Sequence, residues 1–239
     1  MKLIWDKIGD HIYENGASHG VLYVKNNSGY GPGVAWNGLV GVTESPTGAE
    51  ASKIYADNKQ YLSLYSVEEY GATIEAFTYP DEFAECNGEA YIALGTKAAQ
   101  QMRKSFGFSY QTIIGNDIQG DDFAYKIHLV YGCRSGATEK AHQTKSDSPE
   151  PVNFSWEITS MPEAVTGLNN VSHIWINSNE ADPEKLRILE DILYGNELTK
   201  PRLPLPEEVI AIMGEYVPPE EDPDEFYFGF LPILDRRTF

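Results

Sequence analysis

Large apolar residues alternate with small or polar residues along two neighbouring stretches, positions 106–114 and 125–131. The apolar rows begin with Phe106, Phe108 and Tyr110 in the first stretch and with Tyr125, Ile127 and Leu129 in the second. Alternate side chains of a strand share one face of a sheet. Positions 115–122, between the stretches, are rich in Gly, Asn and Asp, which favour turns. The pattern predicts a long antiparallel hairpin.

Shorter runs of strand-forming residues surround this hairpin. They lie at positions 21–24, 33–43, 61–65, 72–78, 154–158 and 173–177. Two weaker patterns favour helices: positions 95–105, and an N-terminal stretch with Ile4, Ile8 and Ile12 on one face. The chain is therefore predicted to be mainly β, an antiparallel β-sandwich or barrel with a small helix.

The character of the chain changes after position 179. Asp182 and Pro183 are a good helix start, a stripe of Leu186, Leu189 and Leu193 follows, and Gly195 can end the helix. A second short helix is expected after Pro206. We therefore predict a β-domain over 1–179, with an N-terminal arm at 1–15, and a C-terminal extension over 180–239. That extension holds the two short helices and an acidic, proline-rich tail from position 215.

The alternation typical of strands is absent between Glu44 and Lys59, which predicts a long loop inside a β region. Long loops in compact domains are usually functional or mobile. Length alone favours neither interpretation.

The formal net charge is −18. Such a charge repels phosphate groups, so it disfavours simple DNA binding and binding to anionic membranes. Solubility is the more common reason for an acidic composition. A use of the charge in function requires further evidence.

Candidate chemistry is sparse. The five histidines are scattered without metal-ligand spacing, and Cys86 and Cys133 fit buried, reduced thiols better than a disulfide. Three acidic residues after Pro80 lack a partner across a sugar cleft, and Asp117, Asp121 and Asp122 miss the spacing of a calcium loop. We predict no enzyme, no cofactor and no metal site. Early charges near Met1 also disfavour a signal peptide, so synthesis in the cytoplasm is expected.

Several longer stretches resemble the major tail proteins of long-tailed bacteriophages and prophages of Gram-positive hosts. They include YADN (55–58), EEYGATIEAFTYPDEF (68–83), RKSFGFSYQT (103–112), YKIHLVYG (125–132), LYG (193–195) and RLPLP (202–206). The resemblance covers nearly the whole chain to about Met213. The segment from Glu215 departs from it.

This resemblance implies a tail tube protein, a structural component of the virion tail that is made in the host cytoplasm. Its copies would form rings, expected to contain six subunits, that stack into a tube through which the DNA genome is ejected. The implied partners are further copies of the chain, other tail proteins such as the tape measure and the tail terminator, and passing double-stranded DNA without specific binding. No membrane partner is implied.

Three sets of residues acquire candidate roles within such a tube. The candidate acidic lining of the lumen is Glu68, Glu69, Glu75, Asp117, Asp121 and Asp122. The candidate contacts between rings, from the predicted loop, are Ser45, Pro46, Thr47, Gly48, Tyr55 and Asp57. The predicted hairpin, with Phe106, Phe108, Tyr110, Tyr125, Ile127 and Leu129, is the candidate contact between subunits, because it would otherwise be an exposed sheet edge.

One alternative from a different class stays open. The 15 tyrosines are also consistent with a soluble β-sandwich binding module, for example one that binds carbohydrate. Filaments with a central channel would favour the tube, and persistent monomers would favour the binding module.

Overall fold

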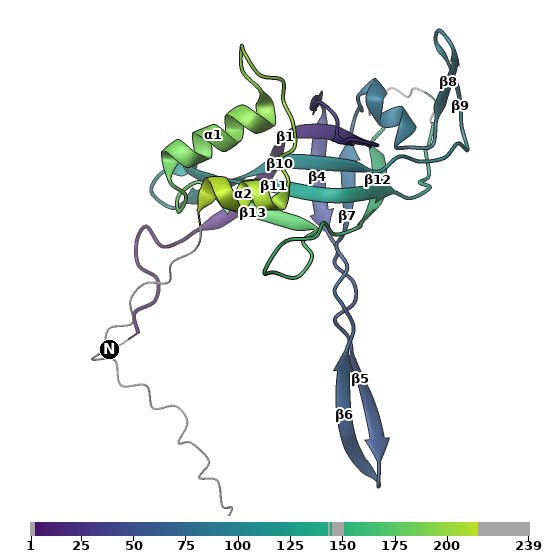
Figure 1. The fold of residues 1–239 in the computed structure, drawn as a ribbon. Coiled ribbons are helices and arrows are strands. Elements are labelled where there is room, and N and C mark those ends of the chain that lie inside the picture. The colour runs from purple at the N-terminus through teal and green to yellow at the C-terminus, as the bar shows by residue number, and fades with distance from the viewer. Residues whose placement is uncertain (1–2, 143, 145–150, 215–239) are drawn as a thin grey trace, which may run out of the picture.

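The computed structural model describes residues 3–142, 144 and 151–214 (Figure 1). Its main element is a nine-stranded sheet with the path β2–β1–β10–β11–β12–β7–β4, in which β13 also pairs with β11 and β3 with β1. The strands are β1 (Tyr13–Asn26), β2 (Gly29–Tyr30), β3 (Val34–Trp36), β4 (Leu39–Glu44), β7 (Gly71–Ala76), β10 (Phe106–Asn116), β11 (Gly120–Ser135), β12 (Phe154–Ser160) and β13 (His173–Asn177). Every pairing in it is antiparallel. The mainly β, antiparallel fold class is confirmed, and the described strands follow an open path.

The predicted hairpin is confirmed as β10 and β11. Its register places Phe108 opposite Val130 and Tyr110 opposite His128. At the turn, the side chain of Asn116 accepts hydrogen bonds from the backbone amides of Ile118 and Gln119. This side-chain cap replaces backbone pairing where the chain reverses.

The hairpin occupies the centre of the sheet, so the prediction that it is an unpaired edge is wrong. β10 is flanked by β1, and β11 is flanked by β12 along one part and β13 along another. Strands from both ends of the chain satisfy its backbone. Sequence alternation identified the hairpin but could not reveal these distant neighbours.

The two faces of the hairpin support two separate cores. Phe106, Phe108 and Tyr110 face an aromatic core that includes Trp36 and Trp156. Figure 1 shows β4, β7 and β12 running across β1, β10 and β11, and this core lies among these strands. Aromatic rings there meet edge to face, as Trp36 and Trp156 do at 5.5 Å between centroids.

The second core lies on the opposite face, under the two helices. Ile127 and Leu129 meet Leu189 of α1 (Pro183–Tyr194) and Val209 of α2 (Pro206–Met213). Both helices have their predicted extents. The side chain of Asp182 caps α1 by accepting hydrogen bonds from the backbone amides of Glu184 and Lys185.

Two helix predictions are wrong. Positions 95–98 are the turn and second strand of a small hairpin of β8 (Ala90–Ala93) and β9 (Thr96–Ala98), in which Gly95 adopts φ +68° at the turn. The N-terminal isoleucines form no helix: Ile4, Ile8 and Ile12 are exposed, and the chain enters β1 at Tyr13. A helix was not predicted after Pro80, where a 3₁₀ turn, η1 (Asp81–Glu85), buries Phe83.

Both cysteines are buried, free thiols, as predicted. Burial raises the pKa of the Cys86 thiol to about 12. Among the described helices, none has both the length and the apolar character needed to span a membrane. The acidic tail from position 215 lies outside the described residues.

Candidate functional site

The segment predicted as a loop at 44–59 is half of a long two-stranded projection, which we call the β-arm (residues 45–70). β5 (Ala51–Ala56) pairs with β6 (Lys59–Tyr65), and a bridge between Thr47 and Glu69 closes the root. Asp57 and Asn58 form the tip with positive φ angles of 51° and 62°, as a tight hairpin turn requires. Figure 1 shows the β-arm extending away from the body. The loop prediction is corrected: neither face of the arm is buried, so no alternation marked it.

The β-arm exposes large apolar side chains to solvent: Ile54, Tyr55, Tyr61, Leu64, Tyr65 and Val67. A two-stranded ribbon is marginal on its own in water, and exposed apolar groups of this extent mark interaction sites. The six candidate residues for contacts between rings all lie exposed on the arm or at its root: Ser45, Pro46, Thr47, Gly48, Tyr55 and Asp57. They are accessible to a partner, and their role stays a prediction.

The candidate contacts between subunits on the hairpin are placed differently from the prediction. Five of them, Phe106, Phe108, Tyr110, Ile127 and Leu129, are buried within the chain. The sixth, Tyr125, is partly buried and its hydroxyl donates to Glu190 at 2.7 Å. Their assignment to a subunit interface is therefore corrected: the two cores of the same chain already cover these side chains.

The six candidate acidic residues do not gather in one place within the chain. Glu68 and Glu69 lie exposed at the root of the β-arm, and Glu75 lies on β7, where its carboxylate accepts from Asn153 at 3.3 Å. Asp117, Asp121 and Asp122 belong to the β10–β11 turn region. Whether they share a lumen depends on the assembly.

Two of these carboxylates hold the N-terminal segment. The backbone amide of Gly9 donates to Asp117 at 3.0 Å, and His11 Nδ1 lies 3.0 Å from the same carboxylate. The Gly9 amide, together with His11, lowers the pKa of the Asp117 carboxyl. The Tyr13 hydroxyl donates to Asp121 at 2.9 Å. The residues near position 10 are thus tied to the hairpin turn, 106 to 108 positions away along the chain.

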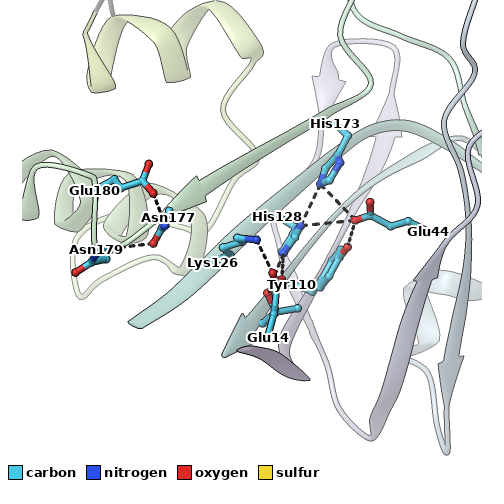
Figure 2. Close-up of polar contacts among 10 residues, drawn as sticks. Glu14, Glu44, Tyr110, Lys126, His128, His173, Asn177, Asn179 and Glu180 are labelled. Atoms are coloured by element: carbon cyan, nitrogen blue, oxygen red, sulfur yellow. Dashed lines mark hydrogen bonds and ion pairs between the residues drawn. The ribbon is translucent and has the colours of Figure 1, made fainter. Parts of the chain in front are cut away.

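A polar cluster lies on the aromatic-core face near the root of the β-arm, and we call it the His–Glu cluster (Glu44, His128 and His173). Figure 2 shows the three side chains pointing toward one another from β4, β11 and β13. His128 Nδ1 lies 3.1 Å from His173 Nε2, and Glu44 Oε1 lies 3.7 Å from each of these nitrogens. The Tyr110 hydroxyl donates to the same Glu44 oxygen at 2.7 Å. The cluster borders a cavity of about 340 Å³.

Burial lowers the pKa of both histidines of the cluster, which favours their neutral form. Burial, followed by the neighbouring His173, lowers the pKa of His128 to about 4. Burial also lowers the pKa of His173, although the negative charge of Glu44 acts to raise it. Neutral imidazoles keep a free lone pair, so they are competent as hydrogen-bond acceptors and as metal ligands.

The prediction that the histidines are scattered is wrong for this pair. They lie far apart along the chain, and antiparallel pairing of β11 with β13 sets His128 opposite Trp175, two residues from His173. The only available signal was alternation, which places His128 on the face opposite Ile127 and Leu129. Spacing along the chain carried no information about β13 or β4.

Comparison with family models gives no match, and neither does comparison with curated proteins. Among solved structures, one similar chain belongs to the "Cryo-EM structure of the anti-feeding prophage (AFP) baseplate, 6-fold symmetrised". The two chains share 6% identity with a TM-score of 0.34, covering 73% of this chain and 97% of the other.

Proposed function

We propose that this chain is a structural protein of a bacteriophage tail, and more narrowly a subunit of the tail tube. Copies close into rings, the rings stack, and the DNA genome passes through the resulting channel. The chain would then reside in the virion tail and contact copies of itself and other tail proteins. The sequence resemblance, which runs to about Met213, supports this proposal.

The observation that carries the proposal is the β-arm. Both of its faces are exposed, and Tyr61 and Tyr65 are 69% and 74% accessible. A monomeric protein rarely keeps so long an apolar ribbon in water, because burial of that area is favourable. A second copy stacked on the first would cover it. Stacking of unlike surfaces, repeated from ring to ring, produces an open filament.

In this arrangement the net negative charge of the chain would have a function in the wall of the channel. Duplex DNA carries about one negative charge per 1.7 Å of its axis, and a basic wall would hold it by releasing counterions. An acidic wall binds DNA weakly and lets it slide. The candidates are the carboxylates at the arm root, Glu75 on β7 and the carboxylates of the hairpin turn, of which Asp117 and Asp121 also anchor the N-terminal segment.

The test is assembly of the purified protein at high concentration, observed by negative-stain electron microscopy. The variant replaces residues 49–67 with an Asn-Gly turn and so keeps the Thr47–Glu69 bridge. The control is Leu94→Ser, at the fully exposed apolar tip of the β8–β9 hairpin. We expect channelled filaments from the wild type and the control, and folded, unstacked particles from the arm variant.

Filaments from the arm variant would reject the role of the arm. Monomers from the wild type under all conditions would reject the tube and favour the soluble binding module. Charge is tested separately, by reversing Glu68, Glu69 and Asp122 to Lys in assembled particles. We expect slower DNA release at low salt, and unchanged release would reject the acidic lining.

A further inference from the structure

We propose that Glu44, His128 and His173 bind one divalent transition-metal ion, with Zn²⁺ as the best match, and that this ion fastens the root of the β-arm to the body. The proposal does not depend on the tail-tube function. It starts from three donor atoms that converge from three strands (Figure 2).

The spacing of the donor atoms fits one ion. His128 Nδ1, His173 Nε2 and Glu44 Oε1 form a triangle with sides of 3.1, 3.7 and 3.7 Å, and the point equidistant from them lies about 2.0 Å from each. Zinc–nitrogen bonds measure about 2.0–2.1 Å and zinc–carboxylate bonds about 2.0–2.2 Å. The three atoms therefore need little movement to become ligands.

Hydrogen bonding alone does not account for this triangle. The 3.1 Å separation between the two imidazole nitrogens can be a hydrogen bond, but Glu44 Oε1 is 3.7 Å from both histidines. That distance is too long for a hydrogen bond. It is close to the roughly 3.4 Å that separates neighbouring ligands of a tetrahedral zinc ion.

The second ring nitrogen of His128, Nε2, points away from the cluster and has an outer hydrogen-bond partner, as many zinc-binding histidines do. His128 Nε2 lies 3.0 Å from the Thr112 hydroxyl, and that hydroxyl donates to Glu14 at 2.6 Å. Since the hydroxyl proton is used on Glu14, the network assigns the imidazole proton to Nε2. The Nδ1 lone pair then points into the cluster. Outer partners of this kind orient a metal-binding histidine and raise its basicity.

Glu44 is also oriented for coordination. Tyr110 is almost fully buried and donates to Glu44 Oε1, while Lys126 pairs with Glu14 rather than with Glu44. The Tyr70 hydroxyl is buried beside the cluster and, among the residues that the structure describes, has no hydrogen-bond partner. Its ring lies 5.0 Å from that of His173. The three protein ligands leave a fourth position for water from the adjoining cavity.

The donor set favours a transition metal over magnesium or calcium. Imidazole nitrogens suit Zn²⁺, Cu²⁺, Ni²⁺ and Fe²⁺, whereas Mg²⁺ and Ca²⁺ prefer oxygen ligands throughout. This protein has two such nitrogens in the cluster.

The position of Glu44 gives the ion a structural effect. Glu44 is the last residue of β4, and the β-arm starts at the next position. His128 and His173 lie on β11 and β13, which pair with each other, whereas β4 pairs with β7. An ion in the cluster would therefore join the two crossing groups of strands where the arm leaves the body.

The test uses the full chain with its purification tag removed and bound metal stripped by chelator. Isothermal titration with Zn²⁺ and the visible absorption of bound Co²⁺ measure stoichiometry and coordination. We expect one equivalent to bind, Mg²⁺ not to compete, and the Tm to rise by roughly 5–10 °C at a hundredfold excess of Zn²⁺ over Kd. Amide exchange at Ser45 and Thr47 should slow.

Variants separate coordination from folding. His173→Ala and the double variant His128→Gln, His173→Ala should lose the Co²⁺ spectrum, whereas His142→Ala, at an exposed histidine, should retain it. Thr112→Val, which changes only the outer partner, should weaken binding by roughly 10–100-fold. No binding by the wild type, or the same binding by a folded double variant, would overturn the proposal. Circular dichroism establishes that each variant is folded.

Discussion

His128 Nδ1 lies 3.1 Å from His173 Nε2, although 45 positions separate the two residues. The pairing of β11 with β13 brings them together, and Glu44 at the end of β4 completes the cluster. Two imidazoles and a carboxylate thus meet at the root of the exposed β-arm.

The metal-free protein should lose stability as the pH falls from 6.5 to 4.5. The unfolded His128 titrates near 6.5 and the folded one near 4, so the unfolded state binds more protons in this window. Burial lowers the pKa of His128 most; the facing His173 and Lys126 lower it further, and the facing Glu44 and Glu14 raise it. His128 alone should account for about 2 kcal/mol of the free energy of unfolding.

Urea unfolding across this pH range, with chelator present, measures the effect. The variant His128→Gln removes the titrating group and should flatten the curve above pH 4.5, while His142→Ala should leave it unchanged. An identical slope in His128→Gln would show that other groups cause the pH dependence.

Removal of a helix anchor should destabilise the whole β-fold. Leu189 is fully buried between α1 and the sheet, so Leu189→Ala should lower the free energy of unfolding by about 2–5 kcal/mol. The neighbouring Ile188 is half exposed, and Ile188→Ala should cost well under half as much. Equal losses in thermal or urea unfolding would show that α1 is not anchored through its Leu stripe.

Polar substitution on the β-arm should affect assembly without affecting folding. In the double variant Tyr61→Ser, Tyr65→Ser, both changes are at exposed positions, so the free energy of unfolding should change by no more than about 0.5 kcal/mol per site. Analytical ultracentrifugation should show fewer large assemblies than in the wild type. Unaltered sedimentation would mean that these tyrosines do not contact another copy.

A methyl group at Gly115 should detach the N-terminal end of β1. A Cβ atom there would lie 2.2 Å from the Tyr13 ring, which covers this glycine. Gly115→Ala should therefore displace Tyr13 and break its hydrogen bond to Asp121. Faster amide exchange over residues 13–15 is the expected observation.

Gly41→Ala is the matched control for this experiment. Gly41 also lies in a strand, but a Cβ atom there would meet nothing within 4 Å. Exchange over residues 13–15 should stay as in the wild type. If the two variants behaved alike, the close contact between Tyr13 and Gly115 would not hold this segment.

Local sequence determined the elements whose apolar residues recur with the spacing of a strand or a helix. Alternation at Phe106, Phe108 and Tyr110 fixed β10, and the Asp182 cap with the Leu186–Leu189–Leu193 stripe fixed α1, because each pattern shows which large apolar side chains share a face. The same signal failed for the β-arm, where both faces are exposed and Ile54 and Tyr61 follow no inward–outward alternation.

Only the tertiary structure decided which strands lie beside the hairpin and which polar groups meet. β1, β12 and β13 convert it from an edge into the centre of the sheet, and they bury the residues that the sequence assigned to a subunit contact. Glu44, His128 and His173 come from three strands with no common spacing. Their convergence depends on long-range strand pairing, and a linear pattern of residues does not encode that pairing locally.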